Sequence, residues 1–301
     1  MSGIILVSLV CLGVRYLVLP QVDTWRPDIE RYLGEALDTQ VSIGSIEAEW
    51  KGLHPQLRAR RVVVYERPTE PLLILPDVSA VLGWRSVLRL EPRFAALTLT
   101  GLTLQARRDP DNRLWVAGQI IDLSETREPD RLRRNAVLQW LSNQGDISLV
   151  EGNLTWLDDR RGAPAVTFTN VSLALRNGFR THRFALQAQG PQALAGTLDV
   201  RGEFELEAGF FRALRHKAAD TSTRWHGRAY AALDGAIPDA WRPWVDVPNV
   251  KGRMAARLWA DFSDGRVGQV ALDAAARDID SGAPSAEQPV GLRFAQATLH
   301  A

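Results

Sequence analysis

The sequence predicts a mainly β protein built from strands that have one apolar face and one polar face. An eight-residue pattern returns four times, with apolar residues at its first, third, sixth and eighth positions. Apolar and polar residues also alternate over long runs, one of which covers residues 250–262. Alternation with a period of two is typical of half-buried strands, so we expect strands over most of the chain. The four octets are at residues 73–80, 97–104, 166–173 and 292–299.

The octet departs from simple alternation because its third and sixth positions are three residues apart. In a β-bulge, two adjacent residues oppose one partner residue, and all four apolar side chains would then share a face. A two-residue hairpin would have the same effect. We favour the bulge because only Thr100-Gly101 and Thr169-Asn170 resemble turn dipeptides. The small hydroxyl residue at position seven is expected on the polar face.

The N-terminal run at residues 3–19 is almost entirely apolar and would span about 25 Å as a helix, at about 1.5 Å per residue. This length predicts a transmembrane anchor rather than a buried core helix. No small residue stands just before Pro20, so we expect an uncleaved signal anchor. Positive charge alone, from Arg26 and Arg31, would place the following chain in the cytoplasm. The anchor residues are Ile4, Ile5, Leu6, Val7, Leu9, Val10, Leu12, Val14, Leu17, Val18 and Leu19.

After the anchor, the sequence predicts a few short helices within a β-rich body, one of them between residues 209 and 223. Trp25, Ile29, Leu33 and Leu37 recur every fourth residue, which indicates an amphipathic helix that lies on the membrane or packs on the first sheet. We expect the chain to continue past residue 301, because an open sheet edge there would lack cover. The predicted parts are the anchor (1–20), the amphipathic helix (21–40), a first β unit (41–130), a helix (131–145) and further β structure (146–301).

The composition excludes several functions. The 36 basic and 35 acidic residues leave no basic field of the kind that nucleic-acid binding uses. The one cysteine, Cys11, rules out a disulfide within the chain, and the scattered histidines predict no metal or cofactor. No nucleophile elbow or phosphate loop is present. Asp158-Asp159 beside Arg160-Arg161 fits a solvated charge cluster better than a catalytic site, so we expect no enzyme activity and no catalytic residues.

Arginine pairs recur in or beside the predicted strands. Charge along the rim of the sheet, which protects strand edges, explains such pairs. Contact with phosphate headgroups is the functional alternative, because guanidinium groups match phosphate oxygens. We favour rim charge, since exposed arginine usually contributes little. The pairs are at residues 60–61, 107–108, 133–134 and 160–161.

Three stretches of the chain resemble the N-terminal region of the YhdP family, which comprises AsmA-like proteins of the Gram-negative envelope. The resemblance extends from about residue 19 to residue 202. The stretches are LPQVDTWRPDIERYLGEALDTQVSIGSIEAEWKGLHPQLRARRVVV, VLGWRSVLRLEPRFAALTLTGLTLQARRDPDNRLWVAG and GNLTWLDDRRGAPAVTFTNVSLALRN.

The resemblance implies a protein anchored in the inner membrane by one N-terminal helix, with an elongated, curved antiparallel sheet in the periplasm. In this family, related to TamB and to bridge-like lipid transfer proteins, the sheet forms an open hydrophobic groove for phospholipid. Other envelope proteins would bind a C-terminal part beyond this chain. The residues expected to line the groove are Leu73, Leu75, Val78, Leu97, Leu99, Leu102, Leu104, Val166, Phe168, Val171, Leu173, Leu175, Phe184, Leu186, Leu198, Val200, Met254 and Leu258.

The sequence leaves two alternatives open. The strand pattern alone also fits a β-sandwich, in which a second sheet covers the apolar faces. In function, the main alternative to a lipid conduit is a structural or assembly protein of the envelope whose β body binds proteins and no lipid. The two folds differ in whether protein covers the apolar faces of the strands. A groove leaves its inner face free for acyl chains, and each CH₂ that an acyl chain buries there contributes about 0.8 kcal/mol.

Overall fold

The computed structural model describes residues 13, 19–37, 39–52, 54–67, 70–83, 94–117, 119–122, 144–178, 181–192, 194, 196–206, 225–246, 251–263, 266–280 and 293–300. The predicted helix between residues 209 and 223 lies outside these residues, as do most of the predicted anchor (1–20) and of the predicted helix at 131–145. Within the described ranges, no helix combines the length and the apolar character needed to cross a membrane.

Strands make up most of the described chain, which confirms the predicted mainly β class. The helical segments described are η2 (Leu19–Trp25), α2 (Arg26–Leu37) and α7 (Pro238–Trp241). The first strands are β1 (Gln40–Lys51), β2 (His54–Arg67), β3 (Glu70–Leu82), β4 (Phe94–Thr100), β5 (Thr103–Arg108), β6 (Arg113–Val116) and β7 (Gln119–Asp122). The later strands are β8 (Asp146–Asp158), β9 (Ala163–Asn177), β10 (Thr181–Gln189), β11 (Thr197–Leu206), β12 (Trp225–Ala236), β13 (Lys251–Ser263), β14 (Arg266–Asp280) and β15 (Arg293–His300).

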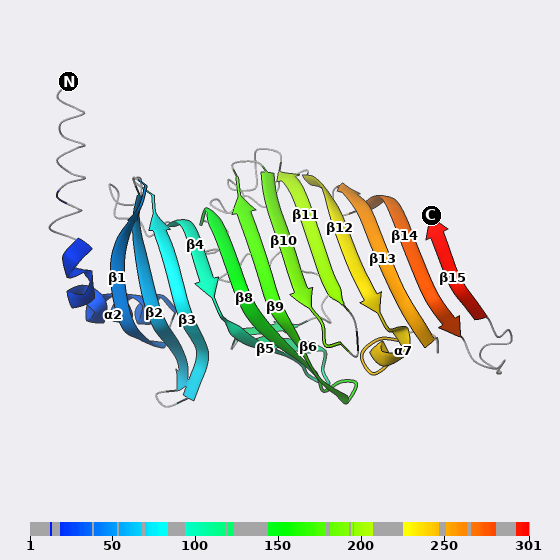
Figure 1. The fold of residues 1–301 in the computed structure, drawn as a ribbon. Helices are drawn as coiled ribbons and strands as arrows, with labels where there is room; N and C mark the ends of the chain where they lie inside the picture. The colour runs from blue at the N-terminus through cyan, green and yellow to red at the C-terminus, as the bar shows by residue number, and fades with distance from the viewer. Residues whose placement is uncertain are drawn as a thin grey trace, which may run out of the picture. The chain divides into compact units, whose positions relative to one another are not determined.

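The strands hydrogen-bond in the order β1-β2-β3-β4-β8-β9-β10-β11-β12-β13-β14-β15, and β5, β6 and β7 branch from β8 (Figure 1). The order is open, because β1 and β15 are its two ends. The prediction of an antiparallel sheet was wrong at one pairing, since β4 and β8 pair in parallel. The β5–β7 strands and the residues after them come between β4 and β8, and such a long connection lets β8 start beside β4 and run in the same direction.

The chain forms two compact units, one of residues 1–103 with 134–150 and the other of residues 104–133 with 151–301. In the first unit, the predicted amphipathic helix is present as α2, and it packs on the sheet. Ile29 and Leu33 contact a buried cluster formed by side chains from η2, β1 and β2. The members of this cluster are Val22, Val41, Ile43, Ile46 and Val62.

Polar side chains of the helical segments also protect the free edge of β1. The Glu30 carboxylate accepts the backbone N–H of Ile43 at 2.6 Å, and the Asp23 carboxylate accepts that of Ile46 at 3.1 Å. The Arg26 guanidinium donates to the Gly44 carbonyl at 2.7 Å. Unpaired backbone groups on an edge strand otherwise invite pairing with another chain, so η2 and α2 both cover the core and close this edge.

The octet at 166–173 contains the predicted bulge. Asn170 and Val171 of β9 together face Ala188 of β10, because Thr169 pairs with Gln189 and Ser172 with Gln187. Asn170 has a left-handed φ of 49°, which inserts the extra residue and keeps the apolar side chains on one face. In the octet at 97–104, Gly101 has a φ of 73° and separates β4 from β5. Among the described residues of the octets at 73–80 and 292–299, none has a left-handed φ.

The same left-handed position occurs in further strands whose sequences lack the full octet. In each, the residue lies between two apolar or small residues that are three apart, as in Ala59 and Val62 or Leu233 and Ala236. Tertiary pairing therefore imposes one backbone kink on strands of differing sequence. In these further strands the kink residues are Arg61 of β2, Glu151 of β8, Gly235 of β12 and Asp278 of β14. With Gly101 after β4 and Asn170 of β9 from the octets, they make up the kink residues of the described chain.

Candidate functional site

Strands β9 to β14 of the second unit are neighbours in the sheet (Figure 1). Apolar cross-strand partners give these strands one continuous apolar face. The cross-strand partners form three rows, and the term apolar face is used below for the residues of these three rows. The first row is Leu173, Leu186, Val200, Ala231, Leu258 and Leu272. The second is Leu175, Phe184, Gly202, Ala229, Ala260 and Val270. The third runs from β10 to β15 and is Ala188, Leu198, Leu233, Ala256, Ala274 and Leu299.

The geometry of the rows gives the face its size. Neighbouring strands lie about 4.8 Å apart, so a row with five steps between strands is about 24 Å long. Gly202 has a specific role in the second row, because the ring of Phe184 occupies the space that a Cβ would take. The Phe184 ring therefore lies over the backbone of β11, and the row continues without a gap.

The apolar face is only partly shielded from solvent. Leu258 is 40% exposed, Val270 50% and Leu299 54%, whereas the side chains from β9 to β11 in the three rows are mostly half-buried. Exposed apolar surface costs about 25 cal/mol per Å² relative to burial. Large contiguous patches of this kind are typical of binding sites. In the first unit, by contrast, the equivalent strand faces pack on the cluster under α2.

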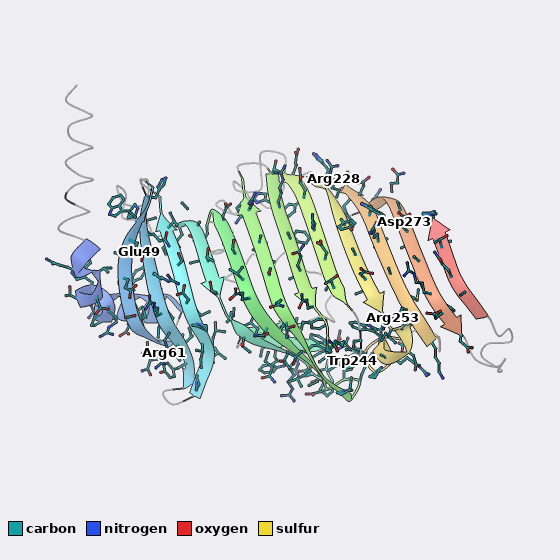
Figure 2. The ribbon with its side chains drawn as sticks, viewed as in Figure 1. Glu49, Arg61, Arg228, Trp244, Arg253 and Asp273 are labelled. Atoms are coloured by element: carbon teal, nitrogen blue, oxygen red, sulfur yellow. The ribbon has the colours of Figure 1, made fainter. Side chains whose placement is uncertain are left out.

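α7 packs on β13, and two tryptophans in and after it contact the start of β9 and the loop before β11. The Trp241 indole donates to the Leu194 carbonyl at 2.8 Å, and the Trp244 indole donates to the Pro164 carbonyl at 3.0 Å. The Trp241 ring lies 6.5 Å from that of Phe168. Figure 2 places Trp244 beside α7, near one end of the strands. Of the described helices, only α7 packs on this unit's sheet, so the three rows have no described helix over most of their length.

The opposite side of the same strands is polar and ion-paired. Arg183 of β10 donates to Glu203 of β11 at 3.0 Å, and Arg201 makes two hydrogen bonds of 2.9 and 2.7 Å to Asp199. The bonds from Arg201 hold the pKa of the Asp199 carboxyl below its usual value. The sheet therefore separates an apolar side from a charged side by the thickness of one backbone layer.

Asp159, Arg160 and Arg161 are exposed, as the prediction of a solvated charge cluster at the turn after β8 requires, but the prediction was wrong for Asp158. Its side chain is 1% exposed and forms a two-bond ion pair with the Arg108 guanidinium of β5, one bond being 3.0 Å long. The backbone N–H of Arg161 also donates to it at 3.3 Å, and Arg161 itself pairs with Asp246. This arrangement joins β5 to β8, so the group is a structural ion pair.

The histidines of the described chain do not converge on one site. Burial lowers the pKa of His182, whose ring stacks on Phe204 at 5.2 Å between centroids. His300 lies beside Asp273 at the far end of the unit. Among the described residues, no three His, Cys, Asp or Glu side chains approach closely enough to hold a metal ion.

The predicted lining residues fall into groups with different surroundings. Those that belong to the apolar face are Leu173, Leu175, Phe184, Leu186, Leu198, Val200 and Leu258. Met254 pairs with Ala236 and Ala276 next to them. Val166 and Phe168 lie at the start of β9 near α7, and Val171 lies at the bulge.

The remaining predicted lining residues lie on β3, β4 and the following segment. Leu75 and Val78 pack against the cluster under α2, and Leu97 and Leu102 are buried. Leu73 and Leu99 lie on β3 and β4, and Leu104 on β5.

The sequence interpretation missed the contribution of β12 and of the small residues. Ala229, Ala231, Ala256 and Ala274 continue the rows between the larger side chains. Alternating alanines give a weak apolar signal, and β12 reads as polar because it contains Arg228 and Tyr230. Searching for alanine in register with the neighbouring strands would have found it.

These features define a β-sheet protein with an amphipathic sheet whose apolar side is largely free of described helices. A family model described as YhdP protein matches residues 1–301. The chain belongs to the YhdP family, which confirms the resemblance predicted from its sequence. Neither the comparison with curated proteins nor that with solved structures gave a match.

Proposed function

We propose that this protein is a non-enzymatic lipid conduit, anchored in the inner membrane with its β body in the periplasm. It would move phospholipid between the inner and outer membranes and so support the outer-membrane barrier. The observation that carries the proposal is the first row of the apolar face, in which six directly opposed apolar residues cross β9 to β14. Membership of the YhdP family supports the setting.

The physical argument rests on the match between this face and an acyl chain. A chain laid across the strands would contact the rows over about 24 Å, given about 4.8 Å between strands. Each CH₂ that leaves water contributes about 0.8 kcal/mol, while repeated similar rows favour no single resting position. Such a surface holds lipid and still lets it move along the sheet.

Site-specific photo-crosslinking tests the proposal, because neighbouring residues of one strand face opposite sides of the sheet. A crosslinker at Leu258 or Leu272 lies on the apolar face, and its matched control at Arg257 or Ala271 lies on the polar side. We expect phospholipid adducts, identified by mass spectrometry from cells, at the first two positions and not at the controls.

The outcomes distinguish the conduit from an assembly protein. Adducts to protein alone at Leu258 and Leu272 would contradict the lipid conduit and favour a protein partner on this face. Equal lipid labelling at Arg257 and Leu258 would indicate membrane proximity without a specific face, and would also contradict the proposal.

A further inference from the structure

The polar side of the second unit carries a hollow of about 580 Å³ that the lipid proposal does not use. One wall is a cross-strand row of charged residues, and Figure 2 places its member Arg228 toward one end of the strands. A second cross-strand row lines the hollow beside the first, with the small side chains Ala174 and Ala185 at one end and an aromatic wall of Tyr230 and Trp259 at the other. The charged row, from β9 to β13, is Arg176, Arg183, Glu203, Arg228 and Asp261.

The charges of this row are not balanced within the described chain. Arg176 and Arg183 are direct cross-strand partners, an arrangement that destabilises a sheet when nothing neutralises it. Arg183 is paired with Glu203, but among the described residues neither Arg176 nor Arg228 has a carboxylate within ion-pair distance. Arg201 also lines the hollow but is ion-paired with Asp199, so Arg176 and Arg228 stand against the single remaining carboxylate of the lining, Asp261. This excess favours an anionic group, which planar guanidinium groups bind well.

The aromatic wall indicates what the anionic group is attached to. The rings of Tyr230 and Trp259 lie 5.4 Å apart, and Trp259 is 39% exposed. An exposed indole next to guanidinium groups offers a flat apolar surface for the C–H face of a sugar ring. A simple inorganic anion would leave this surface unused.

A second hollow of about 370 Å³ adjoins the first along the same strands. Its lining consists mainly of amide and hydroxyl side chains, including Asn170, Ser172 and Gln187. Gln187 is two residues from Ala185 along β10, which corresponds to about 7 Å. Amides and hydroxyls both donate and accept hydrogen bonds, as the hydroxyl groups of a sugar require.

We propose that these two hollows form a binding site for an acidic saccharide. Its carboxylate or phosphate would lie among Arg176, Arg183 and Arg228, one ring would pack on Trp259, and the next would reach the amide-lined hollow. The site faces away from the apolar face, so a lipid bound here would be separated from the three apolar rows by the backbone of the sheet. The proposal is therefore independent of the lipid conduit.

Isothermal titration of the purified full chain tests the site with three probes of matched length. Trigalacturonic acid combines charge and sugar rings, maltotriose has the rings alone, and triglutamic acid has the charge alone. We expect trigalacturonic acid to bind at least tenfold more tightly than either control. The double variant Arg176→Gln/Arg228→Gln and the variant Trp259→Ala should each weaken it at least tenfold.

Arg257→Gln is the matched control variant, because Arg257 is exposed on the same side of β13 and lines neither hollow. It should bind trigalacturonic acid as the unmodified protein does, and all variants should keep the same unfolding temperature. Equal affinity for triglutamic acid would reduce the site to a general anion patch and overturn the proposal. Binding to phosphatidylcholine vesicles with 20% phosphatidylglycerol, in place of trigalacturonic acid, would indicate a lipid headgroup and overturn it too.

Discussion

At the scale of single residues, the ion pair of Arg108 and Asp158 is the most deeply buried charge interaction among the described residues. Asp158 is 1% exposed and Arg108 22%, and the pair joins strands that are fifty residues apart in sequence. Sequence alone could not predict its burial, because Asp158 stands among Asp159, Arg160 and Arg161 in a turn. The carboxylate is buried by β5, and no local pattern specifies that contact.

Arg107 and Arg108 provide a matched pair of substitutions. We expect Arg108→Leu to lower the free energy of unfolding by about 3–5 kcal/mol, because it leaves the Asp158 carboxylate buried without its partner. Arg107→Leu should change it by less than about 1 kcal/mol, since the pair of Arg107 with Asp159 is solvent-exposed. Urea denaturation of both variants measures the difference. Equal losses in the two variants would mean that the buried pair has no special role.

At the scale of elements, the kinks explain why strand sequences here resist simple interpretation. The gap of three predicted a bulge, and the backbone of β9 confirms it at Asn170. Two further kink residues, Arg61 and Glu151, are of types that rarely adopt a left-handed φ. Asp278 is of a type that adopts it more often. The neighbouring strands impose this conformation, so the sequence of one strand does not reveal it. The parallel pairing of β4 with β8 was missed for the same reason.

Gly252 and Gly268 test how strictly the kinks constrain side chains. Gly252 faces the bulge at Asp278 and Ile279, has a φ of 125°, and a Cβ there would lie 2.7 Å from the Arg277 carbonyl oxygen. We expect Gly252→Ala to lower the free energy of unfolding by about 1–3 kcal/mol, as strained backbone positions do. Thermal or urea unfolding followed by circular dichroism provides the measurement.

Gly268→Ala is the control in β14. A Cβ at Gly268 would lie 3.5 Å from the nearest atom, the Asp261 carbonyl oxygen, which is ordinary contact. We expect this change to raise stability by about 0.4–1 kcal/mol, because alanine restricts the unfolded chain more than glycine does. A neutral result for Gly252→Ala would contradict the view that the kink requires glycine opposite it.

At the scale of the whole molecule, one strand pattern serves two purposes. In the first unit the apolar side of the strands packs under α2 as an ordinary core, whereas in the second unit it stays largely without a described helix over it. Alternation predicts that a strand has an apolar side but not what lies on it. Leu75 and Leu186 therefore look equivalent in sequence, and only the structure separates the residue packed on a core from the residue on the apolar face.

A charge on the apolar face tests whether this difference matters for function. Leu258 is 40% exposed, so the folded protein without lipid should tolerate Leu258→Glu. An acyl chain that crosses this point would strip water from the new carboxylate, which costs several kcal/mol. We expect this variant to accumulate normally in cells and to fail to restore the outer-membrane barrier, measured by detergent and antibiotic sensitivity, in a strain that lacks the protein. Arg257→Glu, one residue away on the polar side, should restore it fully. Because the two substitutions add the same side chain to neighbouring positions of one strand, full function of Leu258→Glu would mean that lipid does not pass over the apolar face at β13.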